Sequence, residues 1–162
     1  MSKPKLIPDD VRQICIHMVR GYERRVREYY DKRREIIEGS SARFEVIKDR
    51  DNPEDWKKAA YFFPPSSHAA SRIGEDKAVQ LMNLEADPDT QRMRAVEEAR
   101  ATIGLDLPEA MRNKLAAAIM LNCKAGKKYR YEILDVDGIG RTDFYARRTR
   151  FLIEIAKRLN LM

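Results

Sequence analysis

The stretch that decides the fold lies near the end of the chain and reads Asp137-Gly138-Ile139-Gly140-Arg141-Thr142-Asp143-Phe144-Tyr145-Ala146-Arg147-Arg148-Thr149-Arg150-Phe151-Leu152. Gly138 and Gly140 provide the permissive backbone that a tight turn between two helices needs. Ile139 lies between them and is the one apolar residue that could anchor this turn on a core. After the turn, apolar residues recur at helical spacing and predict one buried stripe: Phe144, Phe151, Leu152, Ile155 and Leu159.

The start of this predicted helix is polar and rich in arginine. A short helix, a glycine-marked turn and a second helix with such a start form the pattern of a helix-turn-helix motif. In that motif the second helix enters the DNA major groove with its N-terminal residues against base edges. Residues 124–162 carry ten Lys and Arg against five Asp and Glu, which supports this interpretation. The alternative is a basic, solvated helix that only caps an all-α domain.

Length and composition set the outer limits of the prediction. The chain has 162 residues, of which 43% are hydrophobic, so it can form one domain or two small ones with a real core. A net charge of +6 favours an anionic partner, with nucleic acid ahead of a membrane. No apolar run approaches the ~20 residues that span a bilayer, and the first residues do not resemble a secretory leader. Cys15 and Cys123 are expected to be free, buried thiols in a cytoplasmic protein.

Upstream of the motif the sequence predicts further helices, and the expected fold class is all-α. A long amphipathic helix is expected from Pro8 to Glu38, ended by Gly39, and it could form a hairpin or pair with a second copy of itself. Residues 40–71 are expected to be an irregular linker with a possible short strand at 43–47. Its aromatic residues, from Trp56 to Phe63, either anchor it on the core or stack on bases. Helices are expected at 71–85, 88–103 and 107–121. The predicted division is a helical region at 1–104 and a helix-turn-helix domain at 105–162.

Catalytic and metal-binding patterns do not stand out in the sequence. The two histidines, His17 and His68, have no cysteine or acidic partner at the spacing of a zinc site. No phosphate-binding loop, dinucleotide motif or nucleophile elbow is present. Asp135, Asp137 and Asp143 could belong to a metal-dependent nuclease, but they flank a turn and a helix start, where Asp is favoured for capping. We therefore expect a protein that is not an enzyme and needs no cofactor or metal.

The residues from Ile139 to Arg148, with the tail from Leu152 to Leu159, resemble phage-encoded regulators of late transcription. These are the RinA-like and ArpU-like groups of Gram-positive phages and prophages, whose C-terminal part is similar to the helix-turn-helix of sigma-factor region 4. The resemblance covers about forty residues and is only architectural elsewhere. Gly140 stands where such motifs often carry a Ser cap. The resemblance implies double-stranded DNA binding in the bacterial host cytoplasm that activates packaging, structural or lysis genes.

Specific contacts follow from this hypothesis. Base edges are expected to be contacted by four residues of the motif, with Arg favoured at guanine: Arg141, Thr142, Asp143 and Tyr145. Phosphates are expected to be contacted by five basic residues: Lys127, Lys128, Arg130, Arg147 and Arg148. RNA polymerase and a second copy of the chain are further candidate partners. Two alternatives stay open: a phage small terminase subunit, and a helical protein-interaction adaptor that does not bind DNA and uses its first helix as the active surface.

Overall fold

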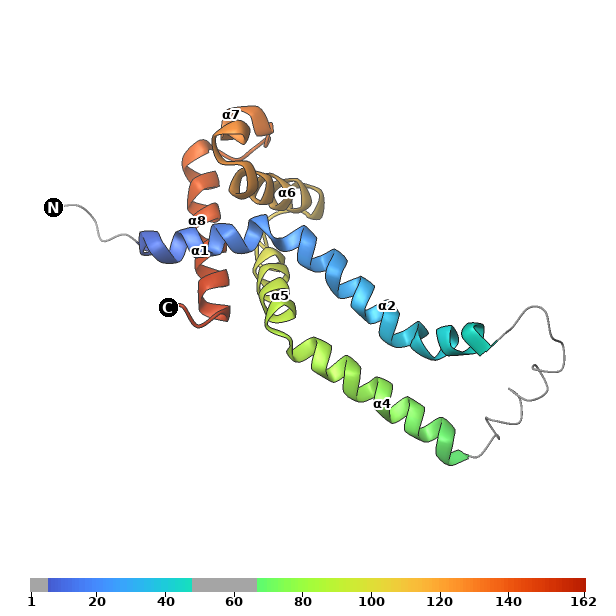
Figure 1. The fold of residues 1–162 in the computed structure, drawn as a ribbon. Coiled ribbons are helices and arrows are strands. Elements are labelled where there is room, and N and C mark those ends of the chain that lie inside the picture. The colour runs from blue at the N-terminus through green and yellow to red at the C-terminus, as the bar shows by residue number, and fades with distance from the viewer. Residues whose placement is uncertain (1–5, 48–66) are drawn as a thin grey trace. The chain divides into compact units, whose positions relative to one another are not determined.

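The computed structural model describes residues 6–47 and 67–162, with side chains described for 6–38 and 74–162. Every regular element in these ranges is a helix, which confirms the all-α prediction for the described part of the chain (Figure 1). In chain order the helices are α1 (Asp9–Arg20), α2 (Tyr22–Ile47), α4 (Ser67–Ala86), α5 (Pro88–Ala101), α6 (Glu109–Ala125), the 3-10 helix η1 (Gly126–Tyr129), α7 (Tyr131–Leu134) and α8 (Arg141–Arg158). Among the described helices, none is both long and apolar enough to cross a membrane.

The chain divides into two compact units. The first, here called the core unit, contains Met1–Arg25 and Gln91–Met162, and the second, called the hairpin unit, contains Val26–Thr90. The expected division at 104/105 does not coincide with these units. The reason is α1, whose buried side chains Val11, Cys15 and Val19 belong to the same hydrophobic core as those of the C-terminal helices. A fragment that begins at residue 105 would therefore lack part of its own core.

The core unit is built around side chains from α1, α5, α6 and α8. The stripe expected on the last helix is confirmed, because Phe144, Phe151, Leu152 and Ile155 are almost completely buried and Leu159 packs against the same core. Ile139 is also buried and anchors the turn before α8, as expected. α1 contacts both α6 and α8, and α6 contacts α8. Burial of a large apolar side chain contributes about 1.5–3 kcal/mol, so this stripe fixes α8 on the core.

The expected continuous helix from Pro8 to Glu38 is wrong at both its middle and its end. Gly21 separates α1 from α2, and α2 continues through Gly39 to Ile47. Arg25 folds back over Gly21, donating from Nη1 to the Met18 carbonyl at 3.1 Å. A Cβ built on Gly21 would lie 2.7 Å from this same nitrogen. The absence of a side chain at Gly21 therefore makes room for the buried Arg25 guanidinium.

The region expected to be an irregular linker is partly helical. Residues 43–47, expected as a possible strand, lie within α2, and α4 begins at Ser67, before the expected start at 71. A strand needs a neighbouring strand for its backbone hydrogen bonds, whereas a helix satisfies them internally. No strand exists in residues 6–47 and 67–162 to pair with this segment. The predictions for the aromatic residues Trp56 to Phe63 lie outside the described residues.

The described helices of the hairpin unit are α4, the part of α2 that begins at Val26 and the first residues of α5, and α2 and α4 run antiparallel (Figure 1). Tyr29 donates its hydroxyl proton to the Glu85 carboxylate, and the Lys77 ammonium donates to the Ile37 carbonyl at 2.8 Å. Tyr29 and Leu84 are buried in this unit. Several large apolar side chains of the unit are exposed: Tyr30, Ile37, Val79 and Met82.

Candidate nucleic-acid interface

The connection from α6 to α8 differs from a regular helix-turn-helix. The segment expected to form the first helix of the motif contains the 3-10 helix η1 and then α7, which has only four residues. Arg130 between them is extended, with φ −70° and ψ 159°. Asp135 ends α7 in the left-handed conformation, with φ 46° and ψ 56°. The short α7 is therefore set by the backbone conformations of the residues on either side of it.

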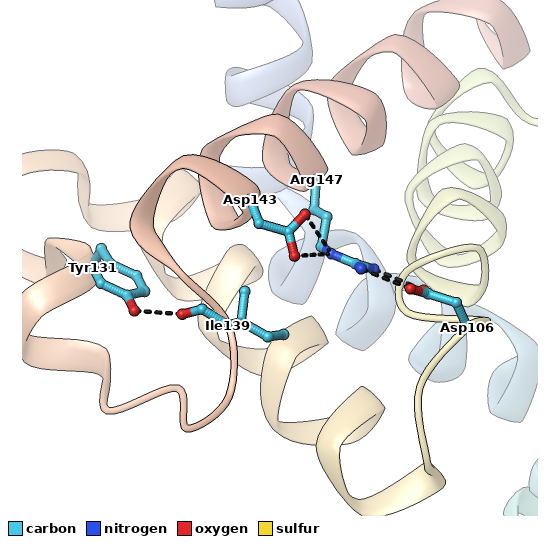
Figure 2. Close-up of polar contacts among 5 residues, drawn as sticks. All are labelled: Asp106, Tyr131, Ile139, Asp143 and Arg147. Atoms are coloured by element: carbon cyan, nitrogen blue, oxygen red, sulfur yellow. Dashed lines mark hydrogen bonds and ion pairs between the residues drawn. The ribbon is translucent and has the colours of Figure 1, made fainter.

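Tyr131 fixes this connection to the start of α8. Its hydroxyl group donates to the carbonyl oxygen of Ile139, as Figure 2 shows. Its ring packs against Phe144, with the ring centroids 5.5 Å apart. One side chain thus holds the turn from both sides, through a backbone acceptor before α8 and through an aromatic ring in the first turn of α8. Nothing local in the sequence distinguishes Tyr131 from the neighbouring Tyr129, so this role of Tyr131 could not be predicted.

The two glycines of the turn have different roles. Gly138 has φ 78°, in the left-handed region, and a Cβ built on it would lie 3.1 Å from the terminal methyl carbon of Met111. Gly140 has φ −71° and ψ 157° and is the N-cap residue of α8. A Cβ on Gly140 would meet nothing within 4 Å. Only Gly138 therefore needs to be glycine for conformational reasons.

The four residues expected to contact bases lie in the first turns of α8 but in different environments. Arg141 and Thr142 are exposed. The Arg141 Nε is 3.4 Å from a carboxylate oxygen of Glu132, and both side chains are largely exposed, so this ion pair is weak. Asp143 is engaged by Arg147 on the next turn. Tyr145 is half-buried and packs its ring edge-to-face on Phe144 at 5.3 Å. The structure thus presents Arg141 and Thr142 most openly.

Arg147, expected to contact phosphate, is held by two carboxylates. Its Nη1 and Nη2 donate to the two carboxylate oxygens of Asp106 at 2.8 and 2.7 Å, and its Nε lies 3.1 Å from Asp143, as Figure 2 shows. Its side chain is only 15% exposed. The hydrogen bonds from Arg147 lower the pKa of Asp106 to about 2, and those from Asp106 raise the pKa of Arg147. Arg147 therefore connects α8 to the segment between α5 and α6.

Four other basic residues line one concave surface, here called the basic pocket. Its lining consists of Asn122, Gly126, Lys127, Arg130, Arg141, Tyr145 and Arg148, and its volume is about 430 Å³. This lining contains no acidic side chain. The structure therefore brings together Lys127, Arg130 and Arg148, three of the five expected phosphate contacts. Lys128 is exposed elsewhere, with its ammonium nitrogen 5.8 Å from the centroid of the Tyr129 ring.

Helix α6 contributes to the position of the residues that line the pocket. The Asn122 amide donates to the carbonyl of Tyr129 at 2.7 Å and so ties η1 to α6. Arg148 is half-buried, and its Nε is buried with no hydrogen-bond partner in the described chain. Its guanidinium also approaches Cys123, where it favours the thiolate, but burial dominates and raises the pKa of the Cys123 thiol. Arg148 is thus the least exposed cation of the pocket.

The core unit also contains both cysteines of the chain. Burial raises the pKa of Cys15 to about 11, so both thiols stay protonated at neutral pH and are poor nucleophiles. Within the described residues, no group of three His, Cys, Asp or Glu side chains could hold a metal ion. The comparison of the chain with protein-family models, curated proteins and solved structures found no match. The function is therefore inferred from the surface around α8.

Proposed function

We propose that this protein is a sequence-specific double-stranded DNA-binding regulator of transcription. The observation that carries the proposal is that exposed polar residues at the start of α8 lie beside the basic pocket. The exposed first turn of α8 offers Arg141 and Thr142, and the basic pocket beside it offers Lys127, Arg130 and Arg148. Arg141 belongs to both. Groups able to read bases and groups able to bind phosphates therefore lie next to each other, as a major-groove reader requires.

The burial pattern of α8 supports this use. Its second half is anchored in the core through Phe151, Leu152 and Ile155, while its first turn keeps one exposed polar face. A helix that reads DNA must be fixed on its domain and still present its N-terminal residues to the groove. At about 1.5 Å per residue the helix is long enough to do both.

In the proposed mechanism the positive charge acts first and the base contacts act second. The net charge of +6 attracts DNA over a distance set by the salt concentration. Cations of the basic pocket then replace counterions along the backbone and position α8. Arg141 is suited to a guanine edge, because its guanidinium can donate two hydrogen bonds to one base. The resemblance to phage regulators makes late-gene promoters, and RNA polymerase bound there, the proposed setting.

The test is DNA binding by the full chain, because a fragment starting at residue 105 would lack α1. The protein is titrated with its own upstream genomic DNA and with a scrambled duplex at several salt concentrations. We expect a preference for the genomic DNA and a steep fall of affinity with salt, with a slope near 0.9 per phosphate contacted. The absence of binding to either duplex at low salt would refute the proposal.

Arg141→Ala tests the proposed base contact. We expect it to weaken binding to the cognate duplex by about 1–3 kcal/mol and to reduce the preference over scrambled DNA. The matched control is Lys114→Ala, which removes the same charge from an exposed position on α6 outside the basic pocket. An Arg141→Ala protein that retains the full preference would show that this side chain does not read a base.

A second candidate function rests on the hairpin unit. Its exposed apolar side chains, among them Tyr30, Val79 and Met82, are the kind of surface that binds other proteins. An adaptor that acts through this surface would bind no DNA, so the same salt titration separates the two proposals. A small terminase subunit would instead bind DNA as a large closed ring, which the mass of the protein in solution would reveal.

A further inference from the structure

The lining of the basic pocket contains four basic side chains and no acidic one, which favours the binding of an anion. Its four basic side chains come from two separate parts of the chain, η1 with Arg130 on one side and α8 on the other. In the described part of the chain, no carboxylate pairs with Lys127, Arg130 or Arg148, whereas Arg141 has Glu132 at 3.4 Å. Like charges repel when they converge without a counterion. Their arrangement around one concavity therefore favours a bound anion over solvent alone.

Arg148 is the least exposed of the four cations that line the pocket. Its Nε is buried and has no hydrogen-bond partner in the described residues. This Nε is closed to solvent, so an anion in the pocket would be bound by the other N–H groups of the Arg148 guanidinium. A guanidinium presents its N–H groups in a planar fork that matches two oxygens of a phosphate group. Asn122, Gly126 and Tyr145 complete the lining.

We propose that the basic pocket is a binding site for a single phosphate group. Arg148 binds it together with Lys127 and Arg130, which leaves Arg141 for the proposed base contact. A pocket of about 430 Å³ is large enough for a phosphate with part of the molecule that carries it. Two sources share this chemistry: a backbone phosphate of nucleic acid, and free phosphate or a small phosphorylated molecule. The first source rests on the proposed function, and the second does not.

This assignment distinguishes arginines that are neighbours in the sequence. Arg147 and Arg150 are on the same helix as Arg148, but neither lines the pocket. Arg147 is already held by Asp106 and Asp143, and Arg150 is exposed. A general basic surface would use Arg148 and Arg150 about equally. A phosphate pocket uses Arg148 and is insensitive to Arg150.

The first arm of the test uses DNA in which one phosphate at a time is replaced by a neutral methylphosphonate. At one position we expect the replacement to weaken binding of the full chain about 10- to 100-fold, as for loss of a charged hydrogen bond. Arg148→Gln should weaken binding to normal DNA, and the same methylphosphonate should then have little further effect. Arg150→Gln is the control and should leave the methylphosphonate effect unchanged. Additive effects of Arg148→Gln at every position would exclude DNA phosphate from the pocket.

The second arm uses inorganic phosphate without DNA. The full chain is titrated with phosphate at constant ionic strength, and the NMR signals of the arginine Nε–H groups are followed. Saturable shifts of the Arg148 signal, lost in Arg130→Gln and kept in Arg150→Gln, would support the pocket. Arg130 is exposed, so its variant is expected to fold even if Arg148→Gln does not.

The two arms separate the possible results. If Arg148→Gln removes the effect of one methylphosphonate, the two changes are coupled and the pocket binds a DNA phosphate. If inorganic phosphate binds but no such coupling is found, the pocket binds a free phosphate or a small phosphorylated molecule. If the native protein binds no duplex, the proposed function fails, and the phosphate titration alone decides the inference. The absence of both coupling and saturable phosphate binding overturns it.

Discussion

Substitution of serine for each glycine of the turn before α8 should change stability in opposite directions. At Gly138 the φ of 78° is a conformation that costs a residue with a Cβ about 1–2 kcal/mol. The new Cβ would also lie 3.1 Å from the Met111 methyl carbon, which can move because it ends a flexible side chain. We therefore expect Gly138→Ser to lower the free energy of unfolding by about 1–2 kcal/mol.

At Gly140 the same substitution meets neither obstacle. Its φ of −71° suits any residue, and a Cβ there has no neighbour within 4 Å. Serine restricts the unfolded chain, which is worth about 0.4–1 kcal/mol. It also adds a side-chain oxygen at an N-cap that has no side-chain hydrogen bond, worth a few tenths of a kcal/mol more than glycine. Gly140→Ser should therefore stabilise the protein by about 0.5–1 kcal/mol.

The assay must follow the core unit, which contains both cysteines. Urea titrations read by the exposure of Cys15 and Cys123 to a thiol reagent report the unfolding of this unit. At an unchanged urea dependence, the midpoint should fall for Gly138→Ser and rise for Gly140→Ser. Shifts of the same sign in the two variants would refute the turn conformation on which the reasoning depends.

Three further expectations follow from the core unit. Phe144→Ala should lower the free energy of unfolding by about 3–5 kcal/mol, because the ring is completely buried, and urea titration measures this loss. Asp106→Asn should reduce the loss in the free energy of unfolding between about pH 4 and 2, measured by urea titration at each pH. Because Arg147 lowers the pKa of Asp106 from 3.8 to about 2, the native carboxylate stabilises the fold above pH 4, and this contribution is lost between about pH 4 and 2. Cys15 and Cys123 should react with a thiol reagent at pH 8 only as fast as the protein opens, so rapid labelling of the native protein would contradict their burial.

The features that the sequence predicted well are those encoded by neighbouring residues. Phe144, Phe151 and Ile155 share one face of a helix by their spacing alone, so their common burial could be inferred without a structure. The turn with Ile139 as its anchor was likewise predicted from local composition. Even here the local rule was incomplete. Both glycines were expected to supply a permissive backbone, and only the structure distinguishes them, by the backbone angles and by the space that a Cβ would find.

Features that depend on distant residues were missed. The inclusion of α1 in the core unit cannot be read from its own stripe, because an amphipathic helix indicates burial but does not identify its partner. The long helix was predicted to be continuous because Gly21 is one weak signal among many strong helix formers. Its role became visible only through Arg25, whose guanidinium occupies the space that a side chain at this position would need.

Arg147 and Arg148 show that charge and position in the sequence do not determine what surrounds a side chain. They are adjacent in the sequence, and both were expected to contact phosphate. Successive residues of a helix point about 100° apart, so the two side chains leave α8 in different directions. One meets the carboxylates of Asp106 and Asp143, and the other enters a pocket without any carboxylate. Loss of Arg147 should therefore reduce stability and act on DNA affinity only through the position of α8, whereas loss of Arg148 should reduce the affinity for phosphate directly.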